Sequence, residues 1–199
     1  VERVMNISTD KAVQPVNFYG ATKMVAERLT VQANHYSPQG MRLCVTRYGN
    51  VMGARGSVLE VWRAALAAGK PLCLTDEAMT RFWMWPDEAV RLVLWVIVHG
   101  LRGAVAVPHL QAFRLTDLAQ ALLPDSGTWM VTGVRPGEKL AEVLMTPEEQ
   151  ARAWWYAPEG QTPVHYVIPA LVQHWGGRDE RDLWRVPPTE FAYDRCDRT

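Results

Sequence analysis

Short apolar runs alternate with helical apolar stripes along most of the chain, a pattern typical of α/β folds. Three apolar runs predict strands of a parallel sheet, at residues 4–8, 41–47 and 104–107. Apolar residues at helical spacing predict longer helices over residues 17–36, 57–68 and 87–99. Ser57 and the Pro86-Asp87 pair provide the expected starts of the second and third helix. We therefore expect part of a Rossmann-like parallel sheet, built from the strands and helices that end such a domain.

A second, smaller unit is predicted from shorter elements between and after these. They are a strand over residues 71–75, a helix over residues 117–123 capped by Thr116, and a strand over residues 129–134. Residues 48–55 and 79–85 are expected to be loops. We accordingly predict an α+β substrate domain from residues 57–85 and 113–199, and a nucleotide-binding domain from residues 1–56 and 86–112.

The periodic pattern weakens after residue 151, where tryptophans recur among prolines. Trp154, Trp155, Trp175 and Trp184 fit three interpretations: a cap over the substrate, an oligomer surface, or aromatic residues that close a small core.

The end of the first predicted strand carries the densest set of reactive side chains. Thr9, Asp10 and Lys11 supply a hydroxyl, a carboxylate and an ammonium in succession. Tyr19 and Lys23 follow on the next helix at a spacing that places both on one face. Because a nearby ammonium favours the phenolate, such a pair is suited to acid/base chemistry. A tyrosine and lysine at this spacing are weak evidence alone, but ligands bind at strand ends of open α/β sheets.

Composition excludes several other classes of protein. A formal net charge of zero argues against nucleic acid or an anionic membrane as the main partner. The longest apolar run, near residues 90–98, is interrupted by Arg91 and is too short for a membrane span. Three cysteines without a C-x-x-C pair favour a reducing cytoplasm over a disulfide framework. The five histidines lack metal-ligand spacing, so no metal site is expected.

The chain contains no G-x-x-G-x-x-G loop, which a dinucleotide-binding fold of this kind uses to hold the pyrophosphate. It also starts at Val1, directly on a strand. We therefore expect these residues to be the carboxyl-terminal part of a longer enzyme, with most of the cofactor site in the preceding part.

Four segments together resemble one enzyme family. They are S-T-D-K-A-V-Q-P-V-N-F-Y-G-A-T-K (8–23), R-Y-G-N-V-M-G-A-R-G-S-V (47–58), T-D-E-A-M-T-R-F-W (75–83) and R-P-G-E-K (135–139). The chain resembles the extended short-chain dehydrogenases/reductases, and more narrowly the inverting nucleotide-sugar 4,6-dehydratases of polysaccharide biosynthesis that act on UDP-N-acetylglucosamine. The larger membrane-attached members carry Met where Tyr19 stands, so the resemblance favours the smaller type that inverts C5.

The resemblance implies a reaction in which C4 of the sugar is oxidised by NADP⁺ or NAD⁺, water is lost across C5 and C6, and the hydride returns to C6. It implies that Tyr19, assisted by Lys23, is the base at the C4 hydroxyl, and that Thr9 binds the same oxygen. Asp10 and Lys11 would perform the acid/base work of the elimination.

The resemblance also implies binding residues and partners. Cofactor contacts would come from Ile7, Ser8, Tyr19, Lys23, Val51, Met52, Gly53, Ala54 and Arg55. The UDP part of the substrate would be bound by Asn50, Val58, Thr75, Arg135 and Glu138. A homo-oligomer is expected when the enzyme is complete, since the helix over residues 17–36 commonly packs against its mate in this superfamily.

Two alternatives remain at this stage. A nucleotide-sugar 4-epimerase or other reductase of the same superfamily would use Tyr19 and Lys23, but the T-D-K step argues against it. A non-catalytic module that binds nucleotide sugars is the second, and the complete set of acid/base residues argues against that.

Overall fold

The central element is a five-stranded sheet in the order β1-β2-β6-β10-β9. The computed structural model describes residues 1–37, 41–123, 127–156 and 165–169. The strands of this sheet are β1 (Arg3–Thr9), β2 (Arg42–Tyr48), β6 (Val105–Pro108), β9 (Trp154–Tyr156) and β10 (His165–Ile168). β1, β2 and β6 are parallel, whereas β10 and β9 are antiparallel to their neighbours. The predicted parallel strands, and β6 as the last of them, are confirmed.

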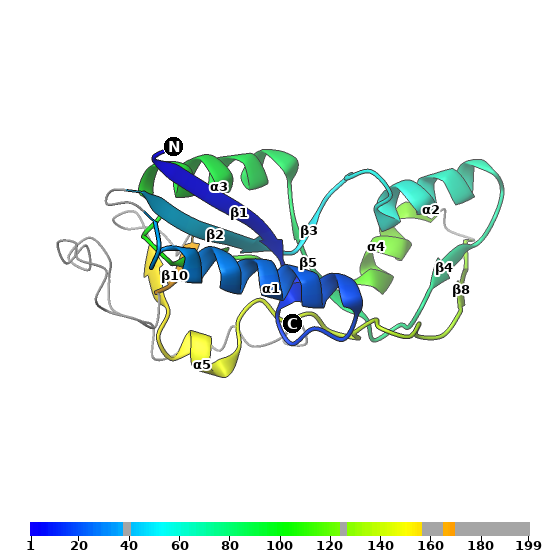
Figure 1. Ribbon diagram of the computed structural model, residues 1–199. Coiled ribbons are helices and arrows are strands. Elements are labelled where there is room, and N and C mark those ends of the chain that lie inside the picture. Colours follow the sequence, from blue (N-terminus) through cyan, green and yellow to red (C-terminus); the bar gives the residue numbers. More distant parts are fainter. Residues whose placement is uncertain (38–40, 124–126, 157–164, 170–199) are drawn as a thin grey trace.

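Two long helices cover β1 and β2 from opposite sides, α1 (Phe18–Ala33) and α3 (Pro86–His99), as Figure 1 shows. α1 begins at the N-cap Asn17, whose side chain accepts a hydrogen bond from the backbone of Gly20. α3 has Pro86 in its first turn, as predicted. The core between helices and sheet contains Val45, Leu92, Val96 and Val107, each almost fully buried.

A second group of elements surrounds its own small core. It contains α2 (Val58–Ala67), β4 (Leu72–Leu74), α4 (Leu115–Leu122) and β8 (Trp129–Val131), all on the right in Figure 1. Its buried residues are Trp62, Leu72, Leu74, Met79, Leu115 and Ala119. β4 and β8 are parallel. The chain is thus a mixed α/β protein with parallel strands, in agreement with the predicted fold class.

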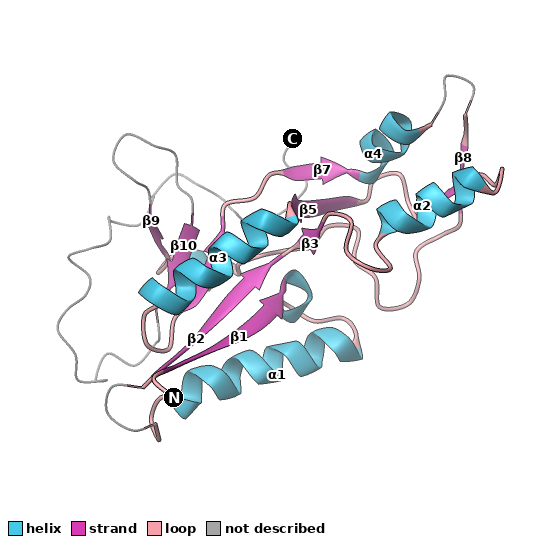
Figure 2. Ribbon diagram, turned by 90° about the horizontal axis from the view of Figure 1, so that it is seen from above, coloured by secondary structure: helices cyan, strands magenta, loops and turns pink. Residues whose placement is uncertain are grey.

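A three-stranded sheet in the order β3-β5-β7 lies between the two groups (Figure 2). Its strands are β3 (Asn50–Val51), β5 (Thr80–Met84) and β7 (Ala112–Arg114). Residues 79–85 were expected to be a loop, and this expectation is wrong. Burial alternates along β5, with Thr80, Phe82 and Met84 inside, which is the period of a strand.

Other elements also differ from expectation. α4 begins at Leu115, after an N-cap position occupied by Arg114, so Thr116 is not the cap. Ser57 occupies the N-cap position of α2, but its side chain makes no capping hydrogen bond. The 3₁₀ turn η1 (Asp10–Ala12) and the short helix α5 (Pro147–Gln150) were not predicted.

The carboxyl-terminal part of the described chain joins the main sheet. β9 and β10 extend it beyond β6, and Tyr166 and Ile168 are buried in the first core. The predicted domain boundaries assign these residues to the second unit. Of the four tryptophans noted above, Trp175 and Trp184 lie outside the described residues.

Candidate active site

The T-D-K step forms a compact polar turn at the carboxyl end of β1. Thr9 is the N-cap of η1, and its hydroxyl donates to Oδ1 of Asp10 at 2.7 Å. The ammonium of Lys11 donates to the same oxygen at 3.0 Å. The other oxygen of Asp10, Oδ2, is buried and has no hydrogen-bond partner among the described residues. A fully buried carboxylate therefore has one oxygen whose hydrogen-bonding capacity is unused among the described residues.

Helix α1 is pressed tightly against this turn. A Cβ on Gly20 would lie 2.2 Å from the carbonyl oxygen of Lys11, a distance at which no side chain fits. Gly20 therefore permits the close approach that brings the start of α1 to the turn that carries Asp10 and Lys11. The sequence analysis did not identify this role, although the glycine directly follows Tyr19.

Tyr19 and Lys23 extend from α1 toward the ends of the central strands. Lys23 donates from Nζ to the carbonyl oxygen of Ile7 at 3.0 Å, which ties the helix to β1. Tyr19 is 53% exposed, so its phenol is open to a ligand. Burial, and secondarily the neighbouring phenol of Tyr19, raise the pKa of Tyr48 at the end of β2. The five predicted catalytic residues, Thr9, Asp10, Lys11, Tyr19 and Lys23, thus cluster around the end of β1.

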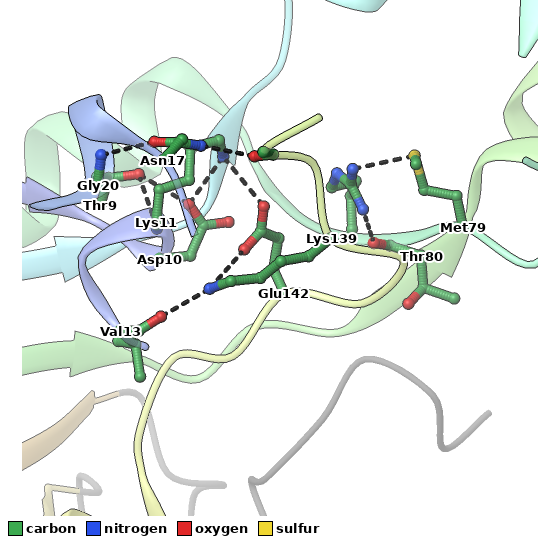
Figure 3. A network of polar contacts seen from close by, with 12 residues as sticks. Thr9, Asp10, Lys11, Val13, Asn17, Gly20, Met79, Thr80, Lys139 and Glu142 are labelled. Atoms are coloured by element: carbon green, nitrogen blue, oxygen red, sulfur yellow. Dashed lines mark hydrogen bonds and ion pairs between the residues drawn. The ribbon is translucent and has the colours of Figure 1, made fainter. Parts of the chain in front are cut away.

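A segment remote in sequence completes the cluster (Figure 3). The side-chain amide of Asn17 donates to the carbonyl oxygen of Gly137 at 2.8 Å. Lys139 donates to the carbonyl oxygen of Val13 at 2.6 Å. Glu142 lies 3.7 Å from the ammonium of Lys11.

Sequence reasoning did not find Asn17, Lys139 or Glu142 as parts of the site. Lys139 was noted only as the end of R-P-G-E-K. Nothing in the local pattern placed Glu142 at the site, because Lys11, its partner there, lies more than a hundred residues away along the chain.

The predicted cofactor residues line the ends of β1 and β3. Ser8 is buried and its hydroxyl has no hydrogen-bond partner among the described residues. Val51 packs against the first core, and the turn after it exposes Arg55. Gly53 in this turn has φ +69° and open space around its α-carbon. Few other residue types adopt a positive φ, so the shape of this turn depends on the glycine.

The predicted substrate residues are spread more widely. Asn50 is in β3 with its side-chain oxygen buried and without a hydrogen-bond partner among the described residues. Val58 packs against the second core, and the hydroxyl of Thr75 lies 3.3 Å from the sulfur of Met79 in that core. These residues are not part of the cluster around Lys11.

Arg135 and Glu138 lie on the turn that precedes Lys139. The Arg135 side chain is 73% exposed and its guanidinium is 3.8 Å from a carboxylate oxygen of Glu138. Glu138 also accepts from the backbone of Arg135 at 3.4 Å. An exposed guanidinium on this turn is available to an anionic ligand.

A buried charge cluster behind the site joins three elements. Arg47 of β2 makes paired hydrogen bonds to Glu27 of α1, at 3.0 and 2.6 Å, and to Glu149 of α5, at 2.8 and 3.0 Å. It also donates to the carbonyl oxygen of Leu144 at 2.9 Å. Burial alone would lower the pKa of Arg47, but its two carboxylate partners raise it above the usual range. This cluster holds α1 and the segment after Glu142 against the same strand.

Within the described ranges, no group of three His, Cys, Asp or Glu side chains is placed to hold a metal ion. Of the helices that the structure describes, none combines the length and apolar character needed to cross a membrane.

Known proteins share both sequence and fold with this chain. UDP-N-acetylglucosamine 4,6-dehydratase (inverting) from Campylobacter jejuni is 40% identical over 153 residues, which are 75% of this chain and 45% of that protein. UDP-glucose 4-epimerase from Rickettsia massiliae is 41% identical over 157 residues, 77% of this chain and 46% of that protein. The chain thus spans about half the length of the curated relatives it matches.

Solved structures show the same fold. Pen from Bacillus thuringiensis superimposes with a TM-score of 0.77 at 28% identity, over 87% of this chain and 54% of that one. A dTDP-glucose 4,6-dehydratase, DesIV from Streptomyces venezuelae with NAD bound, gives a TM-score of 0.62 at 22% identity, over 70% and 50%. A family model described as polysaccharide biosynthesis protein matches residues 1–157, and the chain belongs to that family.

Proposed function

We propose that the protein containing this chain is a nucleotide-sugar 4,6-dehydratase that acts on UDP-N-acetylglucosamine and inverts C5. The observation that carries the proposal is the presence of two acid/base sets in one place. Tyr19 with Lys23 and Asp10 with Lys11 all lie around the end of β1, and Lys11 is 3.0 Å from Asp10. A dehydration that begins with oxidation needs both sets in one pocket, because the C5 proton is acidic only while C4 is a ketone.

The residues around β1 fit the nicotinamide end of NADP⁺ or NAD⁺. The buried hydroxyl of Ser8, which has no partner among the described residues, forms a polar set at the strand end with the carbonyl of Ile7 and the ammonium of Lys23. With Tyr19 and residues 51–55 they would hold the nicotinamide and its ribose. When bound, the cofactor supplies the hydride acceptor and later the hydride donor. Of the two cofactors, NADP⁺ and NAD⁺, we propose NADP⁺.

In the first part of the reaction, Tyr19 accepts the proton of the C4 hydroxyl. Lys23 supports this transfer electrostatically, because a nearby ammonium favours the phenolate. Thr9 contacts the C4 oxygen. Its hydroxyl hydrogen is directed to Asp10 in this structure, so it would offer the substrate its lone pairs or turn to donate.

Asp10 and Lys11 divide the elimination between them. One removes the C5 proton and the other donates a proton to the leaving C6 hydroxyl. Oδ2 of Asp10, which has no partner among the residues described, can hold such a proton, while Oδ1 remains bound to Thr9 and Lys11. Burial of this carboxylate excludes water from the proton it carries.

The UDP part would be bound by residues of the second group and the 135–138 turn. These are Asn50, Val58, Thr75, Arg135 and Glu138. The exposed guanidinium of Arg135 suits paired diphosphate oxygens.

We place the complete enzyme in the cytoplasm as a homo-oligomer. This is in keeping with two free cysteines in the described residues and with Val25 and Leu29 exposed on α1.

A 4-epimerase is the second candidate, because relatives named UDP-glucose 4-epimerase match this chain at a similar identity. An epimerase would need Tyr19 and Lys23 but has no use for an acid/base pair at C5 and C6. The Asp10–Lys11 pair therefore favours the dehydratase.

One experiment separates the two. The complete protein, expressed from the reading frame that contains these residues, is incubated with UDP-N-acetylglucosamine in D₂O, and products are followed by NMR. We expect a 4-keto-6-deoxy sugar with deuterium at C5 and inverted C5 configuration. A C4 epimer without deuterium at C5 would establish the epimerase instead.

The variant Lys11→Ala tests the residue assignment in the same assay. Removal of the ammonium should abolish deuterium incorporation at C5 and product formation. Cofactor affinity should stay nearly unchanged, because Lys11 lies on the turn and not on the face of α1 that carries Lys23. Lys70→Ala, at an exposed lysine, is the matched control. Normal C5 exchange in Lys11→Ala would rule out the role given to Lys11.

A further inference from the structure

Four charged side chains form a continuous chain across the site (Figure 3). Asp10 and Lys11 are joined at 3.0 Å, Lys11 and Glu142 at 3.7 Å, and Glu142 and Lys139 at 3.5 Å. Negative and positive groups alternate, so each carboxylate has a cation beside it. Asp10 and Lys11 belong to the proposed acid/base pair, whereas Glu142 has no role in the reaction so far.

The burial of these side chains differs along the chain. Side-chain exposure is 0% for Asp10, 5% for Glu142, 14% for Lys139 and 31% for Lys11. A buried carboxylate is costly unless cations and hydrogen bonds compensate it. Lys11 is thus the member most open to a substrate, and the more buried Glu142 lies beside it.

We propose that Glu142 is a positioning residue for the acid/base pair, an inference that rests on the proposed dehydratase function. Glu142 provides a second carboxylate for Lys11 on the side away from Asp10. The ammonium is thereby held next to Asp10 without turning away on its flexible four-carbon stem. Oδ2 of Asp10 is buried and, among the described residues, has no hydrogen-bond partner in this arrangement.

Glu142 also connects the acid/base turn to the arm of residues 135–142. This arm contacts the segment of residues 8–23 at two more points. Asn17 donates to the carbonyl oxygen of Gly137, and Lys139 donates to the carbonyl oxygen of Val13. A Cβ on Gly137 would lie 3.0 Å from the Cβ of Asn17, so the arm fits closely. Arg135 begins this arm, so one segment carries both Glu142 and the residue that we propose for the diphosphate.

The variant Glu142→Gln keeps the shape of the side chain and removes its charge. We expect kcat for dehydration to fall on the order of 10²-fold, as for a displaced reacting group. KM for UDP-N-acetylglucosamine should change less than about twofold, because Glu142 does not contact the UDP. In single turnover, reduced nicotinamide should still appear, while C5 deuterium exchange is lost.

Matched variants separate positioning from a loss of folding. Glu148→Gln, at an exposed glutamate six residues on, should retain wild-type kcat. Glu142→Asp, which keeps the charge, should recover part of the activity. Thermal unfolding and UDP affinity are measured for each. Equal losses of C4 oxidation and C5 exchange in Glu142→Gln, or no loss in either, would overturn the proposal.

A second measurement does not depend on the reaction. Lysines are acylated under mild conditions in the complete protein, and modified sites are quantified by mass spectrometry. Glu142→Gln should raise modification of Lys11 several-fold relative to the exposed Lys70, because the ammonium loses one of two carboxylate partners. An unchanged ratio would overturn the role of Glu142. Absence of C5 exchange in the wild-type enzyme would instead reject the dehydratase function, and the labelling would still decide on Glu142.

Discussion

At the scale of single residues, the site depends on carboxylates whose two oxygens have different environments. Asp10 has Oδ1 bound by Thr9 and Lys11 and Oδ2 without a partner among the described residues. Such asymmetry suits a group that must take up or release one proton while it stays in place. Arg135 contrasts with Asp10, because its side chain is exposed and its guanidinium lies 3.8 Å from the carboxylate of the neighbouring Glu138.

Arg135→Lys should weaken binding of the UDP-sugar by about 1.5–3 kcal/mol, the range for a hydrogen bond to a charged group. A lysine offers a point charge where a guanidinium offers two parallel donors. The effect should appear as a raised KM, since the diphosphate is bound alike in the ground and transition states. Calorimetric titration of the complete enzyme with UDP should show the same loss.

Arg63→Lys, at an exposed arginine on α2, is the control for Arg135→Lys and should leave UDP affinity unchanged. If UDP affinity is unaltered in Arg135→Lys as well, Arg135 is only a surface charge on a turn.

At the scale of elements, one buried arginine joins a helix, a strand and a short helix. Arg47 of β2 binds Glu27 of α1 and Glu149 of α5 with short, paired hydrogen bonds. Glu149 also accepts from the backbone of Thr146, which closes a capping box at the start of α5. The helix α1, which carries Lys23, and the helix α5, which follows Glu142, are therefore both fixed to β2.

The stability of this junction should depend on pH through Glu149. Burial alone would raise its pKa, but hydrogen bonds and charge from Arg47 lower it below the usual 4.5. A depressed native pKa means that the stabilisation is fully present above pH 4.5 and is lost as the pH falls through the native value. Urea unfolding midpoints measured from pH 7 downward should therefore drop in the acid range, by more for the wild type than for Glu149→Gln.

Glu149→Gln should also be less stable than the wild type at neutral pH, because it leaves a buried charge on Arg47 only partly compensated. Glu60→Gln, at an exposed glutamate, controls for the general effect of removing a carboxylate. Parallel pH profiles for wild type and Glu149→Gln would contradict this assignment.

At the scale of the whole molecule, two cores are joined by the β3-β5-β7 sheet (Figure 2). The start of α1 points toward the second group, and the arm of residues 135–142 returns from that group to the turn after β1 (Figure 1). β2 pairs with one side of β1, and the other side of β1 is an edge of the described sheet. Val4 and Ile7 of this strand are partly exposed.

The 199-residue chain on its own should self-associate through the edge of β1, because an unpaired strand edge offers hydrogen-bonding groups to another chain. Val4→Lys should reduce this association, since a charge on an edge strand opposes pairing. Sedimentation velocity over a range of concentrations measures the effect. Val61→Lys on α2, where the wild-type side chain is also exposed, should change little. Equal effects of both substitutions would show that general apolar exposure, and not the strand edge, drives association.

The sequence alone determined the parts of this protein that follow from local periodicity. Apolar runs and helical stripes predicted β1, β2, β6 and the long helices, because these patterns reflect which face each element buries. Tyr19 and Lys23 were placed on one side of α1 by their spacing. The strand β5 was not predicted from the apolar pattern. Its alternation of buried and less buried side chains is clear only once the burial of Phe82 and Met84 is known.

Tertiary structure alone decided which distant residues complete the site. The hydrogen bonds from Asn17 to Gly137 and from Lys139 to Val13 join positions 120 and 126 residues apart, and no local pattern encodes such pairs. The same holds for Glu142 beside Lys11 and for Arg47, whose charge would be expected at a surface. Their environment exists only after packing, because burial and the partner charges come from elements that the fold, and not the neighbouring sequence, brings together.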